Sequence, residues 1–184
     1  MQLTSARISP LPEAEWTDEV RELLPKGRKP LNIFTTLVRH PGLFKRWSVF
    51  GGHILSKSSL TPRDRELLIL RTGYRCNSPY EFHQHTRIGL DCGVTREEIQ
   101  KLQQPIAGWS DHDTLLLKAA DELHDDFMLS DETFAKLRGS FDDKQIFDLI
   151  FTVGQYTLVS MFLNSIGVQI ETPEDIAANP SKKD

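Results

Sequence analysis

Three ionisable residues close together in the chain define the chemistry that it could perform. Glu66 lies in one segment, and Glu81 and His85 lie in the next. Glu81 and His85 are four residues apart, so they share a face if their segment is helical. Ile88 and Cys92 continue that stripe, which places the polar pair on the apolar side. A carboxylate and an imidazole are costly there unless they are paired or have a task, and together they can exchange protons near neutral pH.

Each of these residues also has a purely structural interpretation. Glu66 can be a solvated surface carboxylate. Glu81 and His85 can form a structural ion pair at helical spacing. Ser78 precedes a proline, as a residue that only caps a helix would do. The spacing alone leaves these alternatives open.

The helices that must position these residues follow from their start signals. Thr61 and Ser78 each precede a proline, which predicts helices over 62–74 and 79–92. Consecutive helices joined by a short link pack antiparallel, so Glu66 can face the start of the second one. Strand patterns are nearly absent, and we expect an all-α bundle of eight or nine helices. The further expected helices cover 16–24, 31–39, 42–56, 95–102, 110–128, 130–138 and 143–167.

Length and composition indicate one soluble globular domain over 1–170, followed by a polar tail over 171–184. Of the 184 residues, 39% are apolar and 26% are charged. The net charge of −4 and the lack of a basic block argue against a nucleic-acid partner. Two cysteines are too few for a disulfide scaffold and fit the reducing cytoplasm. The first residues show no signal-peptide pattern.

The uncharged stretch 149–170 is long enough to span a bilayer. Its Gln, Asn, Ser, Thr and Gly residues favour a buried core or interface helix instead, so we expect no membrane association.

A bound metal is not expected. Glu66, Glu81 and His85 have suitable ligand atoms for a divalent ion. His83 and His85, however, are two residues apart, which is the wrong spacing for two ligands on one helix face. We therefore expect neither a metal nor an organic cofactor.

The run RDRELLILRTGYRCNSPYEFHQHTRIGLDCGVTREEIQKL resembles the carboxymuconolactone decarboxylase family, which includes the AhpD-like alkylhydroperoxidases. The resemblance is closest over 60–102 and extends more weakly to the first helix and to 143–167. It implies an all-α AhpD-like fold. It also implies homo-oligomers, commonly trimers or hexamers, with a dimer also open.

In AhpD-like members the active site is a glutamate, a CxxC pair and a histidine. By position, the glutamate corresponds to Glu66 and the histidine to His85, while the cysteines correspond to Ser78 and Glu81. Thiol–disulfide exchange needs an attacking and a resolving thiol, so CxxC-dependent peroxidase activity is not expected here.

The decarboxylase branch of the family implies a cofactor-free site that acts on a small carboxylated lactone. We therefore expect a decarboxylase, lyase or lactone hydrolase that uses acid–base chemistry. His85 is the expected proton donor, Glu81 orients it, and Glu66 is a second acid or base. The expected substrate-binding residues are Arg71, Tyr80, Ser78 and His53.

Two other functions stay open at this point. Cys76 precedes a helix start, where a thiolate can be favoured, and could act as a single peroxidatic thiol. The chain could also be a non-catalytic oligomeric binding protein, because a fold does not determine a function.

Overall fold

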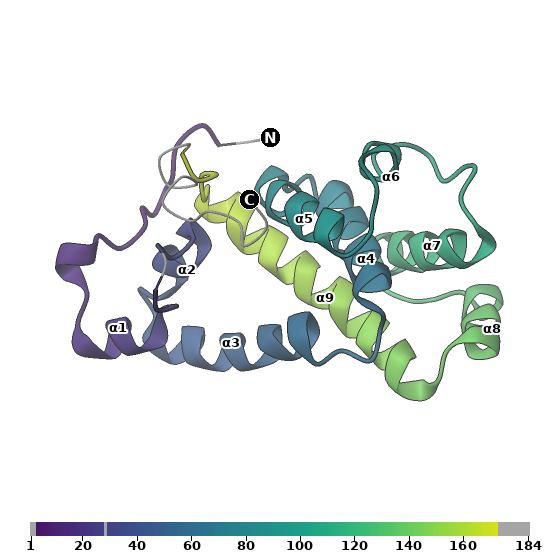
Figure 1. Ribbon diagram of the computed structural model, residues 1–184, viewed down its shortest axis with the longest axis horizontal. Coiled ribbons are helices and arrows are strands. Elements are labelled where there is room, and N and C mark those ends of the chain that lie inside the picture. Colours follow the sequence, from purple (N-terminus) through teal and green to yellow (C-terminus); the bar gives the residue numbers. More distant parts are fainter. Residues whose placement is uncertain (1–2, 28, 173–184) are drawn as a thin grey trace. The chain divides into compact units, whose positions relative to one another are not determined.

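The computed structural model describes residues 3–27 and 29–172, and all regular structure in these ranges is helical (Figure 1). This confirms the expected all-α class and, for the described residues, the expected number of helices. The elements are η1 (Glu13–Glu15), α1 (Asp18–Leu23), α2 (Asn32–Leu37), α3 (Pro41–Ser56), α4 (Pro62–Arg75), α5 (Pro79–Asp91), α6 (Arg96–Lys101), α7 (Asp111–Asp125), α8 (Asp131–Ser140) and α9 (Asp143–Ile166).

Side-chain caps fix the starts of several helices where the sequence predicts them. The Thr61 hydroxyl accepts a hydrogen bond from the backbone N–H of Asp64 at the start of α4. Thr95 and Glu98 form a capping box at α6. Each cap satisfies a backbone donor that has no partner within its helix. The same kind of cap opens α7 at Ser110 and α8 at Ser130.

The chain forms two compact units. The smaller consists of Met1–Gly51 with Leu163–Asp184, and the larger of Gly52–Phe162. The unit boundaries fall within α3 and α9. A single domain over 1–170 stays a prediction.

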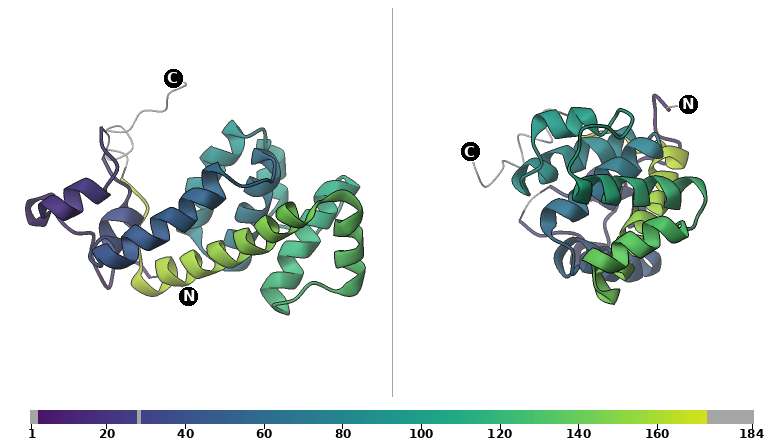
Figure 2. Two further views of the ribbon diagram at one scale, coloured as in Figure 1. Left: turned by 90° about the horizontal axis from the view of Figure 1, so that it is seen from below. Right: turned by 90° about the vertical axis from the view of Figure 1, so that its right-hand side faces the viewer.

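The core of the larger unit surrounds α4, which packs against both α5 and α7 (Figure 1). Helix α8 packs in turn on α7 (Figure 2). Every residue of α4 from Asp64 to Gly73 is buried, so any polar side chain of this segment has to find its partners inside the protein. Apolar residues of α4, α7 and α9 fill this core, among them Leu67, Leu68, Leu70, Leu116, Leu117, Leu149 and Val153.

In the smaller unit, a separate apolar cluster joins α1, α2 and the start of α3. Val20, Leu24, Val38 and Phe44 are its buried members. The chain after α9 is also fixed in this unit, because Glu171 is buried and accepts a hydrogen bond from the backbone N–H of Asn32 at 2.7 Å. The expected polar tail thus begins with an anchored residue, and its residues 173–184 lie outside the described part.

Helix α9 contains most of the uncharged stretch. Among the described residues it is the one helix long and apolar enough to cross a membrane by length and composition, yet 56% of that window is buried inside the protein. Burial on this scale is typical of a core helix of a soluble protein.

Candidate active site

Helices α4 and α5 bring Glu66, Glu81 and His85 together. Asn77 adopts the left-handed conformation between the two helices, with φ of 49°, and helps to reverse the chain. Gly89 lets α5 approach α4 closely, because a Cβ atom there would lie 3.1 Å from Leu70 Cδ1 and 3.8 Å from Glu66 Cβ. The antiparallel arrangement that the sequence predicts therefore places Glu66 beside α5.

His85 is held between two carboxylates. Its Nδ1 lies 2.7 Å from Glu66 Oε2, and its Nε2 lies 3.1 Å from Glu81 Oε1. The relative exposures are 0% for Glu66, 4% for Glu81 and 5% for His85, so water hardly reaches the group. Both ring nitrogens can donate hydrogen bonds only when the imidazole is protonated. The geometry therefore fits a histidine cation.

The electrostatics of the site agree with this protonation state. Burial by itself lowers the pKa of His85, but the hydrogen bonds to Glu66 and Glu81 and the charges of both carboxylates outweigh it. The net effect raises the His85 pKa from 6.5 to about 9. At neutral pH the imidazole is thus a buried cation between two carboxylates.

Arg65 completes the charge balance of the cluster. Its Nε donates to Glu66 Oε1 at 3.0 Å, and its Nη2 lies 3.8 Å from the Cys92 sulfur. The cluster therefore holds two cations, Arg65 and His85, and two carboxylates, Glu66 and Glu81. Such a buried group is tolerable because each charge has an opposite charge in contact.

Tyr156 of α9 forms one wall of the site. Its ring meets the His85 ring edge to face, with centroids 4.9 Å apart. Burial, together with the nearby Glu81 and Glu66 charges, raises the Tyr156 pKa well above 10, so its hydroxyl stays neutral. We did not predict Tyr156 or Arg65 from the sequence. The available signals were a tyrosine inside an uncharged helix and a cation directly beside Glu66.

Two of the expected substrate-binding residues lie at the start of α5. Ser78 occupies the N-cap position but makes no side-chain cap bond, and its Oγ is buried without a hydrogen-bond partner. Plain helix capping is therefore not its role. Tyr80 is also buried, with an exposure of 3%. An unsatisfied buried hydroxyl next to an acid–base group is a natural contact for a substrate atom.

Arg71 has a structural role instead of the substrate-binding one that we expected. Its Nε and Nη2 donate to the two oxygens of Asp121, at 2.8 and 2.6 Å. Its Nη1 donates to the backbone carbonyls of Leu102 and Gln104. These four hydrogen bonds use four of its five N–H groups, and the residue is buried, so Arg71 is held inside the protein rather than available to a substrate carboxylate. Arg71 therefore joins α4, α7 and the segment after α6.

His53 is also engaged elsewhere. Its Nε2 lies 2.8 Å from Asp148 Oδ1, and Ser59 donates to the other Asp148 oxygen from both its backbone N–H and its hydroxyl. This network fastens the end of α3 to α9. The structure thus does not bring His53 into the group around His85, and we leave both His53 and Arg71 out of the proposed site.

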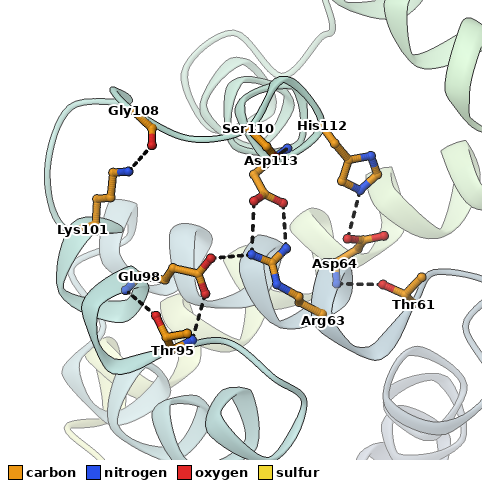
Figure 3. A network of polar contacts seen from close by, with 10 residues as sticks. All are labelled: Thr61, Arg63, Asp64, Thr95, Glu98, Lys101, Gly108, Ser110, His112 and Asp113. Carbon is orange, nitrogen blue, oxygen red and sulfur yellow. Dashed lines mark hydrogen bonds and ion pairs between the residues drawn. The ribbon is translucent and has the colours of Figure 1, made fainter.

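Asp64, His112 and Asp113 form the one group of metal-ligand type among the described residues, with donor atoms within 4.8 Å of one another. Arg63 donates to both oxygens of Asp113 and also to Glu98 (Figure 3). His112 Nε2 lies 3.0 Å from Asp64 Oδ1. Because ion pairs already occupy these carboxylates, we assign the network a structural role in holding α6 and α7 to the start of α4.

Cys76 ends α4, half-buried, with its sulfur 3.6 Å from His124 Nδ1 and 3.9 Å from Thr157 Oγ1. Burial raises the pKa of the Cys76 thiol, and its hydrogen bonds with Thr157 and Ser160 and the charge of Arg75 only partly oppose this. The thiol form therefore dominates at neutral pH. Neither Cys76 nor Cys92 forms a disulfide bond.

We expect Cys76 to react slowly with thiol reagents. At pH 7, iodoacetamide should modify it at least about tenfold more slowly in the folded protein than in denaturant, because the thiolate is the reacting form. Peptide mass spectrometry over time measures this rate. Modification in the folded protein as fast as in denaturant would contradict a protonated, half-buried thiol.

Part of the chain is similar to a known protein family. Residues 41–120, somewhat less than half of the chain, match the model of the carboxymuconolactone decarboxylase family. The match contains Glu66, Glu81 and His85. A search of curated proteins gave no match.

Several solved structures share the fold. An uncharacterized peroxidase-related protein from Silicibacter sp. TM1040 has a TM-score of 0.79 at 13% identity, covering 94% of this chain and 96% of that one. A peroxidase-related protein from Ralstonia eutropha JMP134, described as an alkylhydroperoxidase AhpD core, has a TM-score of 0.78 at 20% identity, with coverage of 93% and 96%. The debrominase Bmp8 has a TM-score of 0.73 at 13% identity, with coverage of 92% and 95%. At these identities the likeness shows the AhpD-like fold, and the family supports an enzyme-like activity on a small molecule.

Proposed function

We propose that this protein is a cofactor-independent acid–base enzyme that acts on a small carboxylated organic compound, as a decarboxylase, another lyase or a lactone hydrolase. The observation that carries the proposal is the buried His85 cation between Glu66 and Glu81. Ser78 and Glu81 occupy the positions at which redox relatives hold thiols, so acid–base chemistry fits this site better than thiol exchange.

The geometry suggests a division of roles within the group. Glu66 is fully buried, makes the shorter contact to His85 and is itself held by Arg65, so it orients the imidazole. Glu81 makes the longer contact, to Nε2, and is the carboxylate that a substrate can replace. Glu66 thus takes the orienting role that we first gave to Glu81. His85 Nε2 is then the atom that delivers a proton.

A decarboxylation at this site would proceed by loss of carbon dioxide, protonation of the substrate and reprotonation of His85. The bond between the substrate carboxylate and its neighbouring carbon breaks, carbon dioxide leaves, and the electron pair moves into an adjacent unsaturated carbonyl. His85 Nε2–H donates its proton to the carbon that lost the carboxylate. A solvent proton, passed through Glu81, restores the imidazolium.

The surrounding residues would bind the substrate. The Ser78 hydroxyl, which is buried without a partner, can bond to a substrate oxygen. The Tyr156 ring, against His85, gives the site an apolar wall. A substrate carboxylate that replaced Glu81 at His85 Nε2 would keep the imidazolium paired with a negative charge. Bmp8, which shares the fold, has been solved with 2,3,4-tribromopyrrole in a cysteine-to-alanine variant, and this supports a small, flat organic substrate here as well.

A screen of small lactones and keto acids, followed by carbon dioxide release, tests the proposal. In the expected result, His85→Gln lowers turnover by about 10²–10⁴-fold, the usual contribution of a positioned proton donor. Cys76→Ser leaves turnover unchanged. His112→Gln is the matched control, because His112 also contacts a carboxylate but lies in the structural network at the start of α4.

Two outcomes would reject the acid–base proposal. Loss of turnover in Cys76→Ser would instead indicate a single-cysteine peroxidase, for which the 3.6 Å contact with His124 is the supporting observation. A folded wild-type protein with no turnover across the screen would indicate a binding protein with a structural ion pair. The reduced state of Cys76 and Cys92, which form no disulfide bond, is the basis for proposing a cytoplasmic location.

A further inference from the structure

The start of α5 differs from four other helix starts of the larger unit. Thr61, Thr95, Ser110 and Ser130 each accept a hydrogen bond from the third backbone N–H group of the helix that follows. Ser78 occupies the same position before α5 but makes no such bond. The backbone ψ angle is 89° at Ser78 and 150–162° at the four capping residues. The conformation at Ser78 is therefore not that of a capping residue.

The start of α5 offers two hydrogen-bond donors as a result. The Ser78 hydroxyl is 1% exposed and has no hydrogen-bond partner among the residues that the structure describes. The backbone N–H of Glu81 lacks the bond that a capping hydroxyl would accept from it. A buried hydroxyl without a partner lowers stability, so its presence indicates a contact that forms only with a ligand.

We propose that the start of α5 is an oxyanion site, where the Ser78 hydroxyl and the Glu81 N–H bind the substrate oxygen that becomes negatively charged during the reaction. This role rests on the acid–base function proposed above. When carbon dioxide leaves, the electron pair of the broken bond passes through the substrate to its carbonyl oxygen, which becomes an enolate oxygen. His85 Nε2–H then gives its proton to the carbon that lost the carboxylate, and the oxygen regains its double bond. Ser78 and Glu81 thus stabilise the electron sink that the proposed decarboxylation needs.

The helix itself favours an anionic oxygen at this place. The first turn of a helix carries a partial positive charge and N–H groups that have no partner within the helix. The Ser78 N–H donates to the Gly73 carbonyl at 2.9 Å, and the Ser78 carbonyl accepts from the Phe82 N–H at 3.0 Å. These two bonds fix the backbone around the hydroxyl before a substrate binds. Donors that are already in place stabilise a developing charge without a cost of reorganisation.

The proposed oxyanion site lies in line with the proton donor. Ser78, Glu81 and His85 follow one another at intervals of three and four residues, so they share one face of α5. Ser78 and His85 are roughly 10 Å apart along the helix axis, and helical side chains lean toward the helix start, which shortens this span. In its present place the Glu81 carboxylate would repel an anionic oxygen, so it has to turn away from His85 as the substrate enters. The arrangement favours substrates whose carbonyl and departing carboxylate share one short frame, such as a β-keto acid or an unsaturated lactone acid.

Denaturant unfolding of Ser78→Ala in the full-length chain tests whether the hydroxyl is kept for a ligand. Because the Ser78 hydroxyl makes no bond, the unfolding midpoint should stay at the wild-type denaturant concentration or rise. Ser110→Ala is the matched control: it removes a hydroxyl that accepts from the Asp113 N–H, so its midpoint should fall. A fall in Ser78→Ala as large as that in Ser110→Ala would show that Ser78 is an ordinary cap and would overturn the oxyanion site.

Calorimetric titration with oxalate and with pyruvate at pH 7 tests the ligand. Oxalate carries a negative oxygen where the enolate of a small keto acid does, whereas the carbonyl oxygen of pyruvate is neutral. The wild type should bind oxalate at least about tenfold more tightly than pyruvate. Ser78→Ala should raise the dissociation constant of oxalate at least about tenfold, the effect of losing a hydrogen bond to a charged group, and change that of pyruvate much less. Ser110→Ala should bind both like the wild type. Equal oxalate affinity in the wild type and Ser78→Ala, or no oxalate binding at about 10 mM, would overturn the oxyanion site.

Turnover separates this role from the proposed function. With a substrate that releases carbon dioxide, Ser78→Ala should lower kcat by about 10²-fold and leave KM nearly unchanged, because the oxyanion exists only during the reaction. Full turnover in Ser78→Ala, together with loss of turnover in His85→Gln, would overturn the oxyanion role and keep the acid–base function. Oxalate binding that depends on Ser78, in a wild type without any turnover, would keep the anion site and reject the acid–base function.

Discussion

Replacing Glu66 with glutamine is expected to lower the free energy of unfolding by about 3–5 kcal/mol at pH 7, the usual effect of breaking a buried ion pair. Glu66 is fully buried, and its two oxygens accept from two different donors, Arg65 Nε and His85 Nδ1. A glutamine has one oxygen and one NH₂ group. Its NH₂ group would therefore face the N–H donor of either Arg65 or His85, and that hydrogen bond would be lost. The substitution would also leave one positive charge in the cluster without an opposite charge.

Denaturant unfolding at pH 7 measures this loss. His85 should also give up its proton more easily in the variant, because a neutral Nδ1 can accept from the glutamine NH₂ group. An NMR titration of the His85 ring would then show a pKa well below the wild-type value of about 9. Glu132→Gln is the matched control, since the Glu132 carboxylate is exposed and pairs with Lys136 at the surface. We expect that control to unfold like the wild type. A loss below about 1 kcal/mol for Glu66→Gln would show that water screens this carboxylate.

The wild-type protein is expected to lose stability as the pH rises from about 6.5 through about 9. His85 binds its proton more tightly in the folded state, with a pKa of about 9, than in the unfolded chain, where the value is 6.5. The folded state therefore holds more protons in this range, and the free energy of unfolding falls with increasing pH. The contribution of His85 is complete below pH 6.5 and is lost above pH 9. At about 1.4 kcal/mol for each tenfold difference in proton affinity, it is on the order of 3 kcal/mol.

Unfolding curves recorded at several pH values between 6 and 9.5 test this expectation. His85→Gln is the comparison protein, because glutamine does not titrate, and its unfolding free energy should change much less over the same range. Burial raises the pKa of Cys76, Cys92 and Tyr156, but these groups affect stability only above their ordinary values of 9.0 and 10.0. These three groups therefore contribute little below pH 9, and the difference between the wild type and His85→Gln reports His85. A flat wild-type profile, or the same slope in His85→Gln, would contradict a buried imidazolium.

The protonation state also determines the chemistry that the site can perform. An imidazole that stays charged up to about pH 9 acts as a proton donor at neutral pH, rather than as a general base. The proposed decarboxylation needs such a donor for the carbon that loses carbon dioxide. If His85 delivers this proton, activity should decline with the same pKa that governs stability. An activity profile governed by a different pKa would separate catalysis from the structural ion pair.

Most of the helical framework could be predicted from local signals. Thr61, Thr95, Ser110 and Ser130 each mark a helix start in the sequence and cap that start in the structure. A cap involves residues only three positions apart, so the sequence contains the whole interaction. The pairing of Glu81 with His85 was predictable for the same reason, because four residues along a helix restore the same face.

Side chains that act across helices could not be assigned in this way. Arg71 looked suitable for binding a carboxylate, yet the carboxylate that it binds is Asp121, fifty residues away on α7. His53 is likewise bound to Asp148 on α9. The packing of α4 against α7 and of α3 against α9 decides these contacts. No local pattern shows which carboxylate a buried cation will meet.

The sequence by itself determined the all-α class, the helix starts, the family resemblance and the shared face of Glu81 and His85, because each depends on residues that are near neighbours along the chain. Only the tertiary structure decided that Glu66 contacts Nδ1 of His85. It also decided that Arg65 and Tyr156 lie beside this pair. These contacts bridge α4, α5 and α9, and they exist only after the core has excluded water. Because water is excluded, the attraction of the two carboxylates for the imidazolium is strong enough to keep His85 protonated. His85 is therefore a candidate proton donor.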